Sequence, residues 1–135
     1  MSKIIIVDDD KFLLDMYSLK FSESGYDVTF ASNGLEVLKK VDEGLKPDIF
    51  LVDVVMPEMD GFTLIGELKK RGVTKDATVI VLSNLGQEED IRKGLTAGAD
   101  GYIIKASATP AEVIARVAEI AANKLKALPR RQAGN

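Results

Sequence analysis

The sequence predicts an α/β fold in which five parallel strands form one sheet and helices cover both of its faces. Five short apolar runs rich in β-branched residues recur at fairly even spacing, and each has the length of a strand. The segments between these runs carry apolar residues at helical spacing. Because strand and helix alternate five times, the strands are expected to run parallel and to be joined by right-handed crossovers.

The strands are expected at residues 4–7, 28–31, 49–52, 79–82 and 102–104. The first, third and fourth runs are continuously apolar, which is typical of strands buried on both faces of a sheet. Around the second run, the segment Asp27-Val28-Thr29-Phe30 alternates polar and apolar side chains instead. It is therefore expected at an edge of the sheet.

Apolar stripes and end signals define the helices between the strands. The stripes are Leu13, Met16, Tyr17 and Phe21; Leu35, Leu38 and Val41; Phe62, Ile65 and Leu68; and, in the last helix, Val113, Val117, Ile120 and Ala121. Asn33 with Glu36, and Thr109-Pro110 with Glu112, predict two capped helix starts. Glycines are expected where helices stop, at Gly25, Gly44, Gly72 and Gly98.

Length and composition suit one domain. The 135 residues are 46% apolar, which is enough for a single packed core, and no apolar run approaches the roughly 18 residues of a membrane span. The last helix is expected to reach about Leu125, so we assign residues 1–126 to the domain and 127–135 to a polar tail or linker stub. The N-terminal apolar segment of four residues is too short for a signal peptide, and we expect a cytoplasmic protein.

Two residue types are missing from the chain, and this limits the kinds of site and reaction that it could support. The chain has no cysteine and no histidine, which excludes disulfides, thiolate nucleophiles, the usual zinc ligands and histidine-based catalytic pairs. The formal charge of −3 argues weakly against nucleic acid as a direct partner. Any reaction must therefore use carboxylates, hydroxyls, lysines and the backbone.

Candidate site residues follow four of the five strands, whereas the second is followed only by the helix cap at Ser32 and Asn33. Asp8, Asp9 and Asp10 follow the first, Asp53 the third, Ser83 the fourth and Lys105 the fifth. In a doubly wound parallel sheet, ligands bind beyond the carboxyl ends of the strands. If the first and third strands are neighbours, then Asp8, Asp9 and Asp53 meet in one pocket, with a hydroxyl and an ammonium beside them.

Three crowded carboxylates repel one another unless a cation neutralises them. Hard oxygen ligands that are few and open to water suit Mg²⁺ or Mn²⁺ better than zinc or calcium. The alternative is that Asp8, Asp9 and Asp10 merely cap the following helix. One aspartate is enough for that task, and we assign it to Asp10.

These residues resemble the receiver domain of two-component response regulators, and in particular the stand-alone receivers of the chemotaxis type. The resemblance covers about residues 3–125. It rests on the segments Ile4-Ile5-Ile6-Val7-Asp8-Asp9-Asp10, Asp53-Val54-Val55-Met56-Pro57-Glu58-Met59-Asp60-Gly61, Val81-Leu82-Ser83 and Gly98-Ala99-Asp100-Gly101-Tyr102-Ile103-Ile104-Lys105. It implies a flavodoxin-like sheet with strand order 2-1-3-4-5 and five helices.

The resemblance also implies roles for the strand-end residues. Asp53 would accept a phosphoryl group, and Lys105 and Ser83 would contact its oxygens. Mg²⁺ would be held by Asp9, Asp53 and the backbone carbonyl of Val55, with Asp8 acting through a metal-bound water. The switch would consist of Ser83 and Tyr102, although the Tyr102 ring could equally well only pack on a neighbouring helix.

The expected partners also follow from the resemblance. The phosphoryl donor would be a sensor histidine kinase, a phosphotransfer protein or a small acyl phosphate. The output would be an unidentified protein that contacts the fourth helix, fifth strand and fifth helix, with no direct nucleic acid or membrane partner. We expect a monomer or a phosphorylation-dependent homodimer, and a protein that catalyses only its own phosphorylation and dephosphorylation.

The sequence leaves two other classes of function open. A pseudo-receiver would keep the fold and bind partners without phosphorylation, which the intact set of site residues disfavours. A Mg²⁺-dependent phosphatase of the haloacid-dehalogenase type would need a second aspartate two residues after Asp53, where Val55 stands.

Five residues near the site carry further expectations. Ala106 stands where the family usually has a proline after the lysine, so we expect a trans peptide and a differently shaped loop. Val55 cannot position a hydrolytic water by hydrogen bonding, which predicts slow loss of the phosphoryl group. Met56 and Met59 are expected to pack rather than to ligate. Gly61 is expected to permit a tight turn into the third helix.

Overall fold

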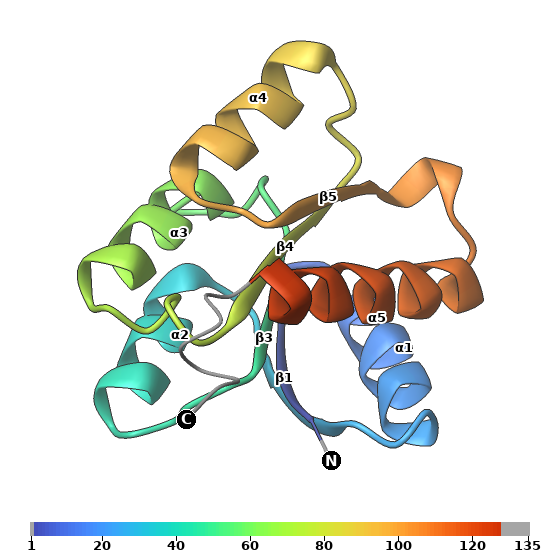
Figure 1. Cartoon of the computed structure of the whole chain (residues 1–135), viewed down its shortest axis with the longest axis horizontal. Helices are drawn as coiled ribbons and strands as arrows, with labels where there is room; N and C mark the ends of the chain where they lie inside the picture. Colours follow the sequence, from blue (N-terminus) through green and yellow to red (C-terminus); the bar gives the residue numbers. More distant parts are fainter. Residues whose placement is uncertain (1, 128–135) are drawn as a thin grey trace.

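Five parallel strands form one sheet in the order β2-β1-β3-β4-β5, which confirms the predicted fold class and strand order (Figure 1). The computed structural model describes residues 2–127. The strands are β1 (Lys3–Val7), β2 (Asp27–Ala31), β3 (Ile49–Val52), β4 (Thr78–Ser83) and β5 (Gly101–Ile104). Each observed strand end lies within one residue of the predicted end.

Helices cover both faces of the sheet. They are α1 (Lys11–Glu23), α2 (Gly34–Asp42), α3 (Gly61–Lys70), α4 (Glu88–Ala97) and α5 (Pro110–Ala127), and a short 3₁₀ turn, η1, spans Lys105–Ser107. Helices α1 and α5 lie together on one face, and α2, α3 and α4 lie in sequence across the other (Figure 1). Helix α5 ends two residues beyond the predicted end, and residues 128–135 of the expected tail lie outside the described residues.

The alternation of side chains along β1 divides the core into two layers. Ile4 and Ile6 pack with α1 and α5, whereas Ile5 and Val7 pack with α2 and α3. Every residue of β3 and β4 is buried, as predicted for strands covered on both faces, and β2 lies at an edge of the sheet, as its alternation predicted. The strands that end at the site are therefore fixed by packing from both sides.

The helix ends follow the predicted signals. The Asn33 side chain accepts a hydrogen bond of 2.8 Å from the Glu36 N–H, and Thr109 and Glu112 cap each other reciprocally. Gly25, Gly44, Gly72 and Gly98 all have positive φ angles, between 75° and 121°. These four positions need glycine because other residues are strained in that conformation.

One part of the predicted core is wrong. Leu35 was expected on the apolar stripe of α2, but it is 50% exposed. The buried stripe consists of Gly34, Val37, Leu38 and Val41. Met56 and Met59 pack against the core on this side, as expected, and the Met59 sulfur lies close above Gly34. Among residues 2–127, no helix is both long and apolar enough to cross a bilayer.

Candidate functional site

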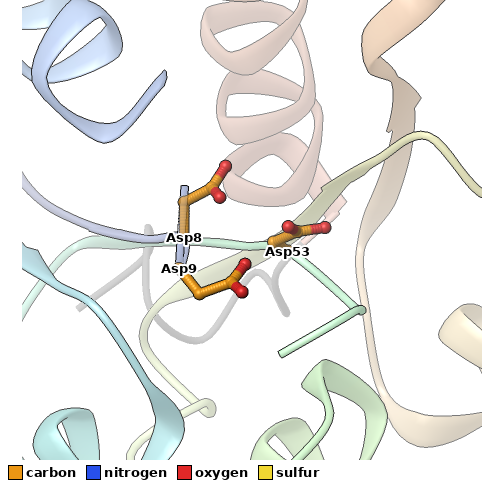
Figure 2. A group of neighbouring side chains, drawn as sticks. All are labelled: Asp8, Asp9 and Asp53. Carbon is orange, nitrogen blue, oxygen red and sulfur yellow. The ribbon is translucent and has the colours of Figure 1, made fainter. Parts of the chain in front are cut away.

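Asp8, Asp9 and Asp53 meet where β1 and β3 end (Figure 2). The two strands are neighbours, and their register pairs Val7 with Val52, so the residue after each strand lies at the same level. One carboxylate oxygen from each aspartate lies within 4.8 Å of those of the other two. Asp8 and Asp53 are buried and Asp9 is exposed, so the cluster opens to solvent on the side of Asp9.

The Lys105 ammonium lies between two of these carboxylates. Its Nζ donates hydrogen bonds to Asp8 Oδ2 at 2.7 Å and to Asp53 Oδ2 at 3.2 Å, and the side chain is almost fully buried. The described residues contain no cis peptide bond, which confirms the trans peptide expected between Lys105 and Ala106, and Lys105 begins η1. One ammonium beside three carboxylates leaves the site with a net negative charge.

Burial has the largest influence on the pKa of Asp53, the candidate phosphoryl acceptor. Removal from water raises the pKa of the Asp53 carboxyl, an effect that the Lys105 charge partly offsets and the Asp8 charge reinforces. Burial also acts to lower the pKa of Lys105, but its hydrogen bond to Asp8 and the two nearby carboxylates outweigh burial, and that pKa is raised. Lys105 is therefore a stable cation at neutral pH.

Asp10 does not belong to the cluster. Its Oδ1 accepts a hydrogen bond from the Leu13 N–H at 3.1 Å and caps α1, as the sequence predicted. Asp8 uses one oxygen to accept from the Asp10 N–H and the other to accept from Lys105. Helix capping thus accounts for one of the three consecutive aspartates.

The donor set fits a divalent cation. Three carboxylates converge, a single ammonium balances only one of them, and one of the three is open to water. Hard oxygen ligands of this kind suit Mg²⁺ or Mn²⁺, which keep several waters when bound. The nearby side chain of Val55 is 61% exposed and offers only apolar atoms.

Gly61 begins α3, where a tight turn was predicted, and the need for glycine comes from a close backbone approach. Its φ angle is not positive, so it does not supply a left-handed turn. A Cβ atom there would lie 2.2 Å from the Asp53 carbonyl oxygen, because the start of α3 folds back against the backbone after β3. The Gly61 N–H donates to the Val54 carbonyl at 2.8 Å. Glycine at this position therefore permits a close backbone approach that holds Asp53 in place.

Ser83 and Tyr102 are connected through the backbone of Leu85. Ser83 is buried at the end of β4, and its Oγ accepts a hydrogen bond from the Leu85 N–H at 3.2 Å. The Tyr102 hydroxyl donates to the Leu85 carbonyl at 2.5 Å, and its ring lies against Gly94 of α4. The ring thus packs on a neighbouring helix, which was one of the two interpretations of Tyr102. Neither Leu85 nor Gly94 carries a signal in the sequence that points to this contact.

Residues 4–118 match the family model of the response regulator receiver domain. Among similar proteins, the chemotaxis protein CheY of Thermotoga maritima is 38% identical over 104 residues, which are 76% of this chain and 84% of that protein. The DNA-binding dual master transcriptional regulator RpaA of Synechocystis sp. is 36% identical over 105 residues, which are 78% of this chain but 43% of that protein. This chain thus spans less than half the length of RpaA.

Solved structures agree with these matches. The receiver domain of the Francisella response regulator 1452 has a TM-score of 0.82 and 32% identity, over 92% of this chain and 99% of that one. A CheY-like receiver domain protein from Methanospirillum hungatei has a TM-score of 0.83 and 28% identity, over 93% and 98% of the two chains.

Proposed function

The chain belongs to the response regulator receiver domain family, and from that premise we propose that it is a switch activated by phosphorylation of Asp53. Receiver domains serve phosphorylation-based signalling in two-component systems. The observation that carries the proposal is the burial of Asp53 between the Lys105 ammonium and two further carboxylates at a strand end.

In the proposed reaction, an Asp53 carboxylate oxygen forms a bond to the phosphorus of a phosphohistidine or a small acyl phosphate. The bond from phosphorus to the donor nitrogen or oxygen breaks, and the donor keeps the electron pair. Such a transfer depends on positioning and on charge stabilisation rather than on a strong base. Lys105 lies 3.2 Å from Asp53 and is placed to balance charge on the phosphoryl oxygens.

Mg²⁺ or Mn²⁺ would supply charge neutralisation for the transferred group. We assign its ligands to Asp9, Asp53 and the backbone carbonyl of Val55, and we assign Asp8 to contact through a bound water. The convergence of the three carboxylates supports this assignment. It also explains why the chain tolerates three acidic groups beside a single ammonium.

The switch would follow from the added charge. A phosphoryl group on Asp53 adds about −1.5 to −2 charge at neutral pH. The Ser83 hydroxyl would then turn from the Leu85 N–H towards a phosphoryl oxygen, and Tyr102 would lose or change its bond to the carbonyl of the same residue. The surface formed by α4, β5 and α5 would change as a result, and a protein partner would read the change.

We further propose a cytoplasmic receiver of the chemotaxis type that takes its phosphoryl group from a sensor histidine kinase or a phosphotransfer protein and acts as a monomer or a phosphorylation-dependent homodimer. The likeness to the Thermotoga CheY supports this assignment. The likeness to RpaA favours a second arrangement, in which a receiver of this kind controls a DNA-binding domain. The complete set of acidic, hydroxyl and ammonium groups disfavours a pseudo-receiver.

The test is incubation with acetyl phosphate and Mg²⁺, followed by mass spectrometry. We expect a gain of one phosphoryl mass that maps to Asp53, is lost in Asp53→Ala and persists in Asp15→Ala, which removes an exposed aspartate of α1. Absence of an adduct on the wild-type chain, together with no Mg²⁺-dependent binding of beryllofluoride, would favour the pseudo-receiver. Sustained release of phosphate from unrelated phosphoesters would favour a phosphatase.

A further inference from the structure

Helix α4 has a glycine at its one buried position. Among its ten residues, all within the described part of the chain, Gly94 alone is buried. Glycine is the least favourable residue after proline in a helix interior. A glycine at the one buried position of a helix therefore calls for a reason in the packing.

The reason is the ring of Tyr102. A Cβ atom at Gly94 would lie 3.0 Å from Tyr102 Cδ2 and 3.2 Å from Cε2, and 3.5 Å from Phe62 Cε1. The first two distances are shorter than an ordinary van der Waals contact, so the ring or the helix would have to move. The missing side chain thus lets α4 approach β5 closely enough to touch the aromatic ring.

The same ring is connected to the site. Its hydroxyl donates to the Leu85 carbonyl at 2.5 Å, and the Leu85 N–H donates to Ser83 Oγ at 3.2 Å. A continuous series of contacts therefore runs from Ser83, at the end of β4, through the backbone of Leu85 and one ring to the backbone of α4. Each step is either a hydrogen bond or a direct packing contact.

We propose that Gly94 is a positioning residue that couples α4 to the state of the site through Tyr102. When the ring lies on Gly94, α4 is held against β5, and when the ring leaves, α4 loses its buried contact. The part of the proposal that concerns phosphorylation rests on the proposed function of Ser83 and Asp53. The contact between Gly94 and Tyr102 stands independently of it.

The chain offers a matched control for this glycine. Gly66 lies in the interior of α3, and a Cβ atom there would meet nothing within 4 Å. Gly66→Ala and Gly94→Ala therefore make the same chemical change in two neighbouring helices, and only the second acts on a packed ring. Both remove the same backbone freedom.

The experiment follows the Tyr102 ring and the α4 amides by NMR in the wild type, Gly94→Ala and Gly66→Ala, before and after addition of beryllofluoride with Mg²⁺. In Gly94→Ala we expect the Tyr102 ring signals to shift without beryllofluoride, and the beryllofluoride response of the α4 amides to be lost. In Gly66→Ala we expect wild-type behaviour in both respects. In a Tyr102→Ala background, Gly94→Ala should have no further effect on the α4 amides.

Tyr102→Phe supplies a second variant that adds no atom at Gly94. It keeps the ring but removes the bond to Leu85, so α4 should again fail to respond while the ring stays against the helix. Unchanged ring signals and a full α4 response in Gly94→Ala would overturn the proposal. If the wild type does not bind beryllofluoride, the proposed function fails, whereas unshifted Tyr102 ring signals in Gly94→Ala without beryllofluoride would overturn the positioning role of Gly94 separately.

Discussion

The strands that position Asp53 and Ser83 and the helix that lies beside Tyr102 are held in opposite ways. Every residue of β3 and β4 is buried, whereas α4 has one buried residue in ten. Asp53 and Ser83 thus stand on elements fixed by packing on both faces, while α4 lies on the protein with little buried apolar surface. The contrast suggests a division in which the chemistry is rigid and the responding surface is easy to move.

Local interactions make up for the weak packing of α4. Gln87 and Asp90 form a reciprocal capping box at its start, and its first turn carries three acidic residues, Glu88, Glu89 and Asp90, beside the positive end of the helix dipole. Helix α3 has the same length but buries Gly61, Leu64, Ile65 and Leu68. Helix α4 can therefore stay helical while it shifts as a unit, because its capping does not depend on the core.

The largest expected effect is the difference in stability loss when a leucine is replaced by alanine in β3 and in α4. Leu51 of β3 is 1% exposed and Leu95 of α4 is 49% exposed. We expect Leu51→Ala to lower the free energy of unfolding by about 2–5 kcal/mol, since it leaves a cavity in the core, and Leu95→Ala to lower it by less than about 1 kcal/mol. Urea unfolding followed by circular dichroism measures both. Similar losses in the two variants would show that α4 is packed as firmly as the sheet.

Hydrogen exchange tests the contrast without any mutation. We expect the α4 amides to exchange through local opening, at a free energy at least about 2 kcal/mol below that of the β3 amides, which is roughly 30-fold in rate. The amides of α3 provide the comparison on the same face of the sheet and should resemble β3. Equal protection of α3 and α4 would contradict the view that α4 moves separately.

The buried strands and the acidic cluster at their ends could be predicted from the sequence almost completely. Apolar runs indicated the buried strands, and the strand-end positions of Asp8, Asp9 and Asp53 predicted the cluster that these residues form. The prediction succeeded because parallel strands place their carboxyl ends at one edge of the sheet. The capping role of Asp10 followed equally well from the preference for aspartate at helix starts.

The packing of α4 against Tyr102 could not be predicted in this way. The contact of Gly94 with Tyr102 and the bridging backbone of Leu85 depend on how α4 approaches β5, and no periodicity records that distance. Gly61 shows the same limit, because the sequence predicted a tight turn there but not the approach of the Asp53 carbonyl that requires glycine. Leu35 was placed on the core side of α2, and only packing reveals that Val37 occupies that side instead.

A smaller effect is expected in the way that Asp53 makes the stability of the protein depend on pH. Burial raises the pKa of Asp53 above its usual value of 3.8, so protonated Asp53 favours the folded state below that pH, and this contribution is lost as the pH rises through the raised pKa. We therefore expect Asp53→Asn to be more stable than the wild type at neutral pH, by on the order of 1 kcal/mol, and the gain to vanish in acid.

Urea unfolding of Asp53→Asn and the wild type across acid and neutral pH measures this difference. The matched control is Asp15→Asn, at an exposed position of α1, which should show no comparable gain. Lys105 does not interfere, because its pKa is raised above 10.5 and it remains charged throughout this range. A loss of stability in Asp53→Asn at neutral pH would mean that the ion pair with Lys105 outweighs the cost of burial.

The smallest expected effect concerns the exposed wall of the site. Val55 is 61% exposed and has no polar atom to orient a hydrolytic water, so a phosphoryl group on Asp53 should be lost slowly. We expect Val55→Asn to release phosphate roughly two- to five-fold faster, which is under about 1 kcal/mol of barrier, and Val55→Ile to match the wild type. Release of phosphate after removal of acetyl phosphate measures the rate.

Because Val55 does not contribute to the Ser83–Leu85–Tyr102 series, the beryllofluoride response of the α4 amides should stay unchanged in both variants. A changed α4 response would show that the site and the helix are coupled by a route other than Tyr102, and an unchanged release rate in Val55→Asn would show that access of water is controlled elsewhere.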